Sequence, residues 1–195
     1  MTSDRSWRWL PPEGPGLDAV TALAAARGWT VTADRAPTLF APRSLEWSDG
    51  AGLRVRWDEF HEFGARRLWV EHNDASRREA ALAELTRRVP TWPIEQIRSQ
   101  ATRAPLIPRL RAMRAWTLTA TWEDEPALPD ALAALARDDD PVARASALTL
   151  AYRLSDRYPA PMRELAEQRA AADEGPLAAG WRQLADALAD ASAAT

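Results

Sequence analysis

Apolar residues recur with a helical period at the start of the chain and with a strand period after it. Leu17, Val20 and Ala24 share one helix face, which predicts a helix over residues 16–27. A second helical stripe covers residues 76–89. Between these helices lie three stretches that alternate between apolar and polar positions, as strands with one buried face do, and a shorter apolar run: 29–34, 53–58, 67–72 and 45–47.

These elements predict an α+β domain over residues 16–92. Its order is a helix, an antiparallel sheet of three or four strands, and a second helix, and the helices are expected to cover the apolar face of the sheet. Residues 1–15, which contain Trp7 and Trp9, are assigned to a separate N-terminal arm. The arm either folds back on the body or is held for a partner.

The second half of the chain, residues 93–195, repeats a helical pattern. Pro105, Pro141 and Pro176 are spaced by 36 and 35 residues, and each stands at the start of an apolar helical stripe. Another amphipathic segment precedes each stripe. A period of about 35 residues that carries two helices is typical of a helical solenoid, in which stacking buries the faces that one helix pair cannot bury alone. In the last stripe, Trp181 is predicted to be buried.

The clearest repeating unit spans residues 126–154. It combines an apolar first helix with the turn Asp140-Pro141, with Arg144 shortly after the turn, and with the small Ala147 inside the second helix. In these features it resembles a HEAT repeat. The resemblance implies that Asp140 and Arg144 tie adjacent turns together. The other two units lack this Asp and Arg, so a HEAT-like stack and an irregular helical bundle both remain open.

The composition favours a soluble protein of the cytoplasm. Hydrophobic residues make up 46% of the chain, yet no apolar run is long enough to cross a membrane and no export signal is visible. Cysteine is absent, which excludes disulfides, thiol nucleophiles and cysteine-bound zinc. All 25 basic residues are arginine, a bias typical of a GC-rich bacterial genome. The net charge of −3 is too small to indicate nucleic acid or a membrane surface as the partner.

No constellation of residues indicates catalysis, a metal or a cofactor. The two histidines, His61 and His72, do not have the spacing of metal ligands on one element. Neither a phosphate-binding loop nor a nucleophile elbow is present in the sequence. We therefore expect a protein that is not an enzyme and that holds no metal and no cofactor.

One segment of the helical half combines arginine with tryptophan. No acidic residue occurs between Glu95 and Glu123, and this interval holds the residues that we predict to bind a partner: Arg109, Arg111, Arg114 and Trp116. Trp and Arg are enriched at the centres of interfaces, and Arg forms bidentate pairs with carboxylates. The partner is then another protein with an acidic surface, as for an adaptor, an assembly subunit or a toxin antidote. Internal pairing of these arginines with residues 123–125 is the alternative.

Nucleic-acid binding is the rival function. The order helix, strands, helix is similar to double-stranded-RNA-binding domains, whose phosphate-binding position would fall at Ser76, Arg77 and Arg78. The helical half is similar in residue type to HEAT-like DNA glycosylases, which place aromatic residues and an Asp on the concave face of the stack. The matching residues would be Trp116, Trp122 and Asp124.

Overall fold

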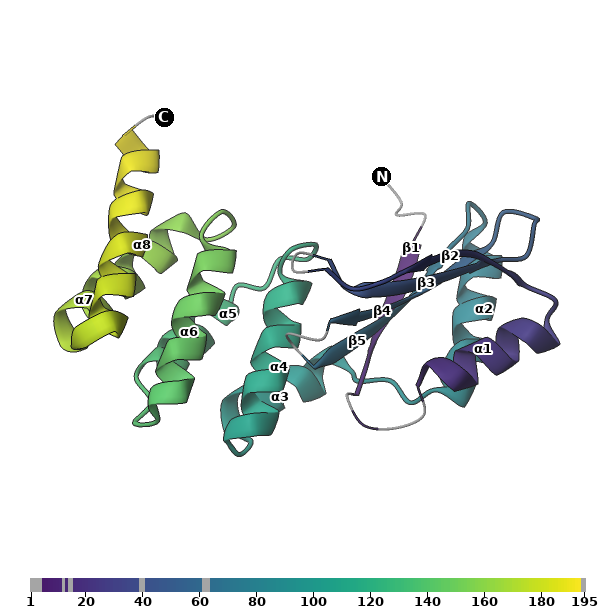
Figure 1. The fold of residues 1–195 in the computed structure, drawn as a ribbon, viewed down its shortest axis with the longest axis horizontal. Helices are drawn as coiled ribbons and strands as arrows, with labels where there is room; N and C mark the ends of the chain where they lie inside the picture. Colours follow the sequence, from purple (N-terminus) through teal and green to yellow (C-terminus); the bar gives the residue numbers. More distant parts are fainter. Residues whose placement is uncertain (1–4, 12, 14–15, 39–40, 61–63, 194–195) are drawn as a thin grey trace. The chain divides into compact units, whose positions relative to one another are not determined.

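The chain divides into two compact units, residues 1–96 and residues 97–195. A computed structural model describes residues 5–11, 13, 16–38, 41–60 and 64–193 (Figure 1). The division falls slightly beyond the boundary that the sequence predicts after residue 92. Of the described helices, none is long and apolar enough to pass through a membrane.

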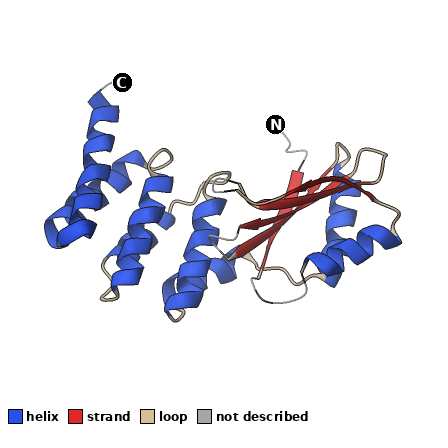
Figure 2. Ribbon diagram, in the orientation of Figure 1, coloured by secondary structure: helices blue, strands red, loops and turns tan. Residues whose placement is uncertain are grey.

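The first unit contains a five-stranded antiparallel sheet and two helices (Figure 2). The strand order is β1-β5-β4-β3-β2, so every neighbouring pair is antiparallel and the two edges are β1 and β2. The elements are β1 (Arg5–Leu10), α1 (Leu17–Ala26), β2 (Thr30–Arg35), β3 (Arg43–Ser48), β4 (Arg54–Phe60), β5 (Ala65–Glu71) and α2 (Ala75–Arg88). The predicted helix–sheet–helix order is confirmed.

The sheet has one strand more than predicted, because the expected N-terminal arm supplies β1. This strand pairs with β5 along its full length, with Trp7 opposite Trp69 and Trp9 opposite Arg67. Alternation is present in the sequence, since Ser6, Arg8 and Leu10 face one way and the tryptophans the other. The adjacent Pro11 suggested an irregular arm, but it stands just outside the strand, where a missing N–H costs no sheet hydrogen bond.

The other edge strand, β2, is irregular and almost entirely exposed. Its pairing with β3 shifts register between Val31 and Ala33. Val31 is one of the few large apolar side chains that lie largely in solvent. The sequence also has a short apolar run at residues 38–41, of which residues 39–40 lie outside the described part of the chain.

Helices α1 and α2 pack on one face of the sheet and close the core of the first unit. Val20 and Leu23 of α1 and Leu82 and Leu85 of α2 are buried against strand residues. The strand side of this core is made by Leu10, Leu45, Trp47, Val55, Trp57, Leu68 and Val70. Because side chains alternate along each strand, the residues between these positions project from the opposite face.

The second unit is helical. Its boundary with the first falls in the first turn of α3 (Ile94–Arg103). The helices that follow are α4 (Leu106–Thr119), α5 (Leu128–Ala136), α6 (Pro141–Leu154), α7 (Pro159–Ala172) and α8 (Gly175–Ala193). The predicted succession of a sheet domain and an all-helical region is thus confirmed.

The helices of this unit contact one another in two rows. Helices α5 and α6 form one pair and α7 and α8 another, while α4, α6 and α8 contact in succession and α5 contacts α7. Buried Leu132, Ala147, Leu150 and Trp181 lie along these contacts. The apolar stripes therefore bury one helix pair against the next, and the prediction that Trp181 is buried is confirmed.

Candidate functional site

Two arginine–aspartate ion pairs recur in the helical unit, and we call them together the Arg–Asp ladder. Arg109 in α4 donates from Nη2 to Oδ2 of Asp138 at 2.7 Å. Arg144 in α6 has its Nε 3.4 Å from Oδ1 of Asp173. In both pairs the acid follows the arginine by 29 residues, and the second pair follows the first by 35. Each arginine stands in the first turn of its helix and each aspartate in the turn of the next helix pair, so the ladder joins consecutive pairs.

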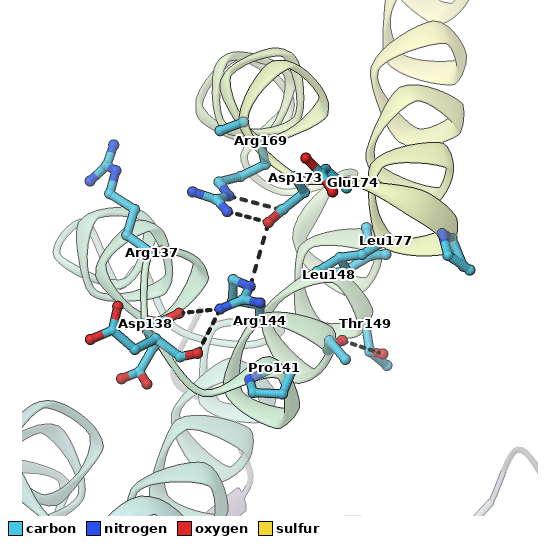
Figure 3. A pocket seen from close by; sticks show the side chains of 14 residues that line it. Arg137, Asp138, Pro141, Arg144, Leu148, Thr149, Arg169, Asp173, Glu174 and Leu177 are labelled. Atoms are coloured by element: carbon cyan, nitrogen blue, oxygen red, sulfur yellow. Dashed lines mark hydrogen bonds and ion pairs between the residues drawn. The ribbon is translucent and has the colours of Figure 1, made fainter.

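Arg144 holds two turns at once. Its Nη1 donates to the backbone oxygens of Asp138 and Asp139, both at 2.8 Å, while its Nε faces Asp173 (Figure 3). Asp173 also accepts from Nε of Arg169 at 3.0 Å, and its side chain is only 6% exposed. The guanidinium therefore links the turn between α5 and α6 to the turn between α7 and α8.

The other residues of the HEAT-like motif have local roles. Oδ1 of Asp140 accepts from the backbone N–H of Val142 at 2.7 Å and caps the N-terminus of α6. Ala147 is fully buried. The sequence did not suggest the acids of these ion pairs, which are Asp138 for Arg109 and Asp173 for Arg144. Their 35-residue spacing, equal to that of the two arginines, was the available signal.

Local hydrogen bonding stabilises the charged form of Asp138. The backbone N–H of Asp140 donates to Oδ1 of Asp138 at 2.9 Å, and this bond, helped by the guanidinium of Arg109, holds the pKa of Asp138 below its usual value. The carboxylate of Asp138 is therefore charged throughout the neutral pH range.

An open groove of about 960 Å³ lies between the two turns that Arg144 joins (Figure 3). Its walls include Pro141 and Leu148 of α6 and Leu177 of α8, with Arg144 and Asp173 at its base. Charged residues of both turns, among them Arg137, Asp139 and Glu174, line the groove together with these apolar side chains.

The edge of this groove carries carboxylates that are not used internally. Asp139 and Glu174 are both exposed, and within the described chain no hydrogen bond or ion pair engages either side chain. They also lie 35 residues apart, each directly after an aspartate of the Arg–Asp ladder. Arg144 and Arg169 of the groove already bind Asp173, while Arg137, among the described residues, donates only to the neutral side chain of Gln168. The groups left for a ligand are therefore the two carboxylates of Asp139 and Glu174 and the guanidinium of Arg137.

Apolar side chains follow the same period along this edge. Ile107 is 55% exposed and Val142 is 54% exposed, and both stand at the second position of their helices. Leu177, at the corresponding place near the start of α8, is half-buried and lines the groove. Ile107, Val142 and Leu177 thus stand at corresponding places near the start of three helices, spaced by 35 residues.

The predicted partner-binding set on α4 needs correction. Trp116 is 3% exposed, and its indole Nε1 donates to Oε2 of Glu125 at 2.6 Å. Arg98 grips the same buried carboxylate with bonds of 2.8–3.1 Å. Trp116 is therefore an internal side chain, because the turn after α4 folds back and places Glu125 against it.

The arginines of α4 also differ from the prediction. Arg109 binds Asp138 and is not open to a partner. Internal pairing was the alternative that the sequence left open, but the acid is Asp138 and not one of residues 123–125. Arg111 and Arg114 are partly buried. The residues that the prediction gathered into one surface are thus divided between internal contacts and a partly covered helix face.

The residues that suggested nucleic-acid binding are largely engaged within the chain. Arg77 donates to Asp49 at 2.9 Å, and Arg78 donates to Ser6 and to the backbone oxygen of His72. Buried Trp116 cannot stack on a base, although Trp122 and Asp124 of the same set are exposed. Ser76, Arg77 and Arg78 do stand in the first turn of α2, where the resemblance places them, so the nucleic-acid alternative stays a prediction.

Metal ligands and known relatives give no further site. Among the residues that the structure describes, no three His, Asp or Glu side chains gather as a metal site, and His61 lies outside those residues. The chain matched no protein-family model, no curated protein and no solved structure.

Proposed function

We propose that this chain is a non-enzymatic protein-binding module of the cytoplasm, built from an α+β unit and a HEAT-like helical stack. Three features support the HEAT-like part: the helix pairs contact in two rows, the Arg–Asp ladder repeats after 35 residues, and Arg144 spans two turns. Stacks of this kind bury one repeat against the next and offer long surfaces for partners.

The docking surface in this proposal is the turn edge, which we define as Ile107, Asp139, Val142, Glu174 and Leu177. The observation that carries it is the repetition of exposed Ile107 and Val142 at equivalent helix positions, with Leu177 at the next such position lining the groove. Because nearly half of each residue is already covered, burying the remainder under a partner would contribute roughly 1–1.5 kcal/mol each.

The partner segment that suits the turn edge is apolar and basic. Its aliphatic or aromatic residues would cover Ile107 and Val142, and a Lys or Arg would pair with Asp139 or Glu174. The acidic partner expected for α4 does not suit this edge, because Arg109 and Arg144 already hold aspartates.

A capture experiment with matched variants tests the proposal. The tagged full chain is used as bait in lysate of its native host, beside Val142→Asp with Glu174→Arg. The control is Ala187→Asp with Asp186→Arg, which introduces the same two residues and the same change of net charge at exposed positions later in α8. We expect one protein to be captured by the wild type and the control and lost from the turn-edge variant. The captured protein, once purified, should bind with a Kd at least about tenfold weaker to the variant.

Two results would reject the proposal. One is a partner that binds the turn-edge variant as well as the wild type. The other is recovery of nucleic acid in place of protein, with a steep fall of affinity with salt on duplex or single-stranded probes.

A further inference from the structure

The face of the sheet opposite α1 and α2 carries arginine and tryptophan in place of apolar residues. Strand alternation brings these side chains together from four strands: Arg5 of β1, Arg35 of β2, Arg54 and Arg56 of β4, and Arg67 and Trp69 of β5. We call this set the arginine face. Arginine and tryptophan were predicted to share a surface on α4, and they share one on this sheet instead.

A buried aspartate anchors the arginine face. Asp58 is fully buried, and its carboxylate accepts four hydrogen bonds from side chains of the same sheet. The donors are Ser44 Oγ at 2.8 Å, Arg56 Nε at 2.7 Å, Arg67 Nη2 at 2.9 Å and Trp69 Nε1 at 2.6 Å. Because both carboxylate oxygens are occupied, the side chains of Arg56, Arg67 and Trp69 are held in fixed directions.

Trp69 is enclosed by cations. The guanidinium carbon of Arg67 lies 3.9 Å from the ring centroid of Trp69, and those of Arg5 and Arg56 lie 5.6 and 5.9 Å away. Guanidinium groups stack on indole through cation–π attraction, which keeps the positive charges close together despite their repulsion. The ring thus serves as a support for arginines.

A hollow of about 220 Å³ opens on this face with an excess of positive charge. It is lined by Trp69, by four arginines and by two acids: Arg5, Arg35, Arg54, Arg56, Glu46 and Glu71. Glu71 is shared by Arg5 and Arg54, at 3.3 and 2.6 Å. Arg56 binds Asp58, and for Arg35 no acceptor is found among the residues described.

We propose that this hollow is a second docking site, which receives a carboxylate side chain from an acidic segment of a partner protein. Charge complementarity supports this occupant, since four guanidinium groups meet two carboxylates. The side chains of Arg5 and Arg54 are 54% and 52% exposed, so they can turn toward a ligand without being drawn out of a core. Arg offers a carboxylate two parallel N–H donors.

The geometry disfavours a nucleic-acid strand in the same place. A hollow of 220 Å³ is smaller than the range of about 300–1,000 Å³ that is usual for small-molecule sites, and it suits one side-chain group. Arg67 covers one side of Trp69, and Glu46 and Glu71 would repel a row of phosphates. The proposal does not depend on the turn edge of the helical unit, because every residue it uses lies in the first unit.

Fluorescence anisotropy on the full chain tests the proposal. The probe is a labelled peptide of eight glutamates, with a peptide of eight lysines and a strand of eight thymidines as comparisons. The variant is Arg35→Glu with Arg54→Glu, and the matched control is Arg87→Glu with Arg88→Glu on the exposed side of α2. Both double variants change the net charge equally.

We expect the glutamate peptide to bind the wild type, and its Kd to rise at least about tenfold in the arginine-face variant and less than about threefold in the control. Arg35→Gln alone, at an exposed position, should weaken binding with an unchanged melting curve. No binding of the glutamate peptide, or an equal loss in both double variants, would overturn the proposal. Tighter binding of the thymidine strand than of the peptide would overturn the choice of a carboxylate ligand.

Discussion

The guanidinium group of Arg144 bonds to two turns of the chain at once. It donates to two carbonyl oxygens of one turn and faces the carboxylate of Asp173 in the next. Carbonyls at this position lie just before the start of α6, where no helical N–H reaches them. Arg144 therefore satisfies backbone groups as well as pairing charge. Its removal takes this donor from the two carbonyl groups, whereas Asp173 keeps its bond from Arg169.

We predict that Arg144→Ala lowers the free energy of unfolding by about 1–3 kcal/mol, because hydrogen bonds to two carbonyls and an ion pair are lost from a partly buried place. Urea denaturation followed by circular dichroism measures the change. Arg182→Ala, at an exposed position of α8, should change stability by less than about 0.5 kcal/mol. Equal stability of wild type and Arg144→Ala would show that the link between the turns carries no energy.

Asp58 is a buried carboxylate, and its neighbours stabilise its charged form. Burial alone would raise the pKa of Asp58, but the hydrogen bond and charge of Arg67, with help from Arg56 and Ser44, hold its pKa below the usual value. A carboxyl with a lowered folded-state pKa stabilises the fold fully above its ordinary pKa, and this contribution is lost as pH falls through the lowered pKa.

We expect Asp58→Asn to cost about 3–5 kcal/mol at pH 7, since it leaves the buried guanidinium of Arg67 uncompensated. The gap between wild type and variant should stay constant from pH 7 to 5 and narrow below about pH 4, where aspartate begins to protonate. Urea titrations at a series of pH values test both statements, with exposed Asp34→Asn as the control. A gap that widens in acid would contradict the assigned direction of the pKa shift.

Single residues were the level at which sequence reasoning was least reliable. Trp181 was predicted to be buried because an apolar stripe surrounds it, and it is. Trp116 was expected at the surface because arginines precede it, yet Glu125 in a later turn holds it inside. The difference is that the first depends on neighbours within one helix, whereas the second depends on how a turn folds back. Periodicity carries no information about such turns.

Helices and strands with one buried face were predicted best, because their apolar residues repeat with the period of the element. Helices α5, α6 and α8 follow from spacing of apolar residues, and β4 and β5 from alternation. Strand β1 was missed although its sequence alternates, because the adjacent Pro11 suggested an irregular arm and its partner β5 lies far along the chain. The groove between the turns was missed for the same reason, because it is made by two turns that are distant in sequence.

At the scale of one helix, Trp181 is the largest of the buried side chains by which α8 packs on its neighbours. Trp181 is fully buried, with Leu184 one turn later, and Gly180 lets α8 approach Leu148 of α6 closely. We predict that Trp181→Ala costs about 3–5 kcal/mol through lost contacts and a cavity. Circular dichroism during urea unfolding gives the value, with Gln183→Ala on the exposed side of α8 as the comparison. A cost below about 1 kcal/mol would mean that α8 is attached elsewhere.

The whole molecule has two surfaces that differ in the charge they present. The turn edge of the helical unit presents carboxylates beside aliphatic residues, and the arginine face of the first unit presents guanidinium groups around Trp69. A net charge of −3 conceals this separation. Under the two proposals above, the chain would hold two unlike segments, from one partner or from two.

We predict that the two surfaces act independently. Val142→Asp with Glu174→Arg should change the Kd for the glutamate peptide by less than about twofold, because substitutions with no shared contacts have additive effects. The reciprocal measurement uses Arg35→Glu with Arg54→Glu and the captured basic partner. Anisotropy and calorimetry report the two affinities. A change of about fivefold or more in either cross-test would reveal coupling between the surfaces.

The irregular pairing of β2 also affects how copies of this chain meet one another. An exposed outer strand is a template onto which a strand of another molecule can add, and continued addition leads to fibrils. The register shift between Val31 and Ala33 breaks the even spacing of the outward N–H and C=O groups, and Asp34 and Arg35 place charges beside it. A regular strand cannot pair with these unevenly spaced N–H and C=O groups over more than a few residues. The sheet thereby resists polymerisation at the strand where it is least covered.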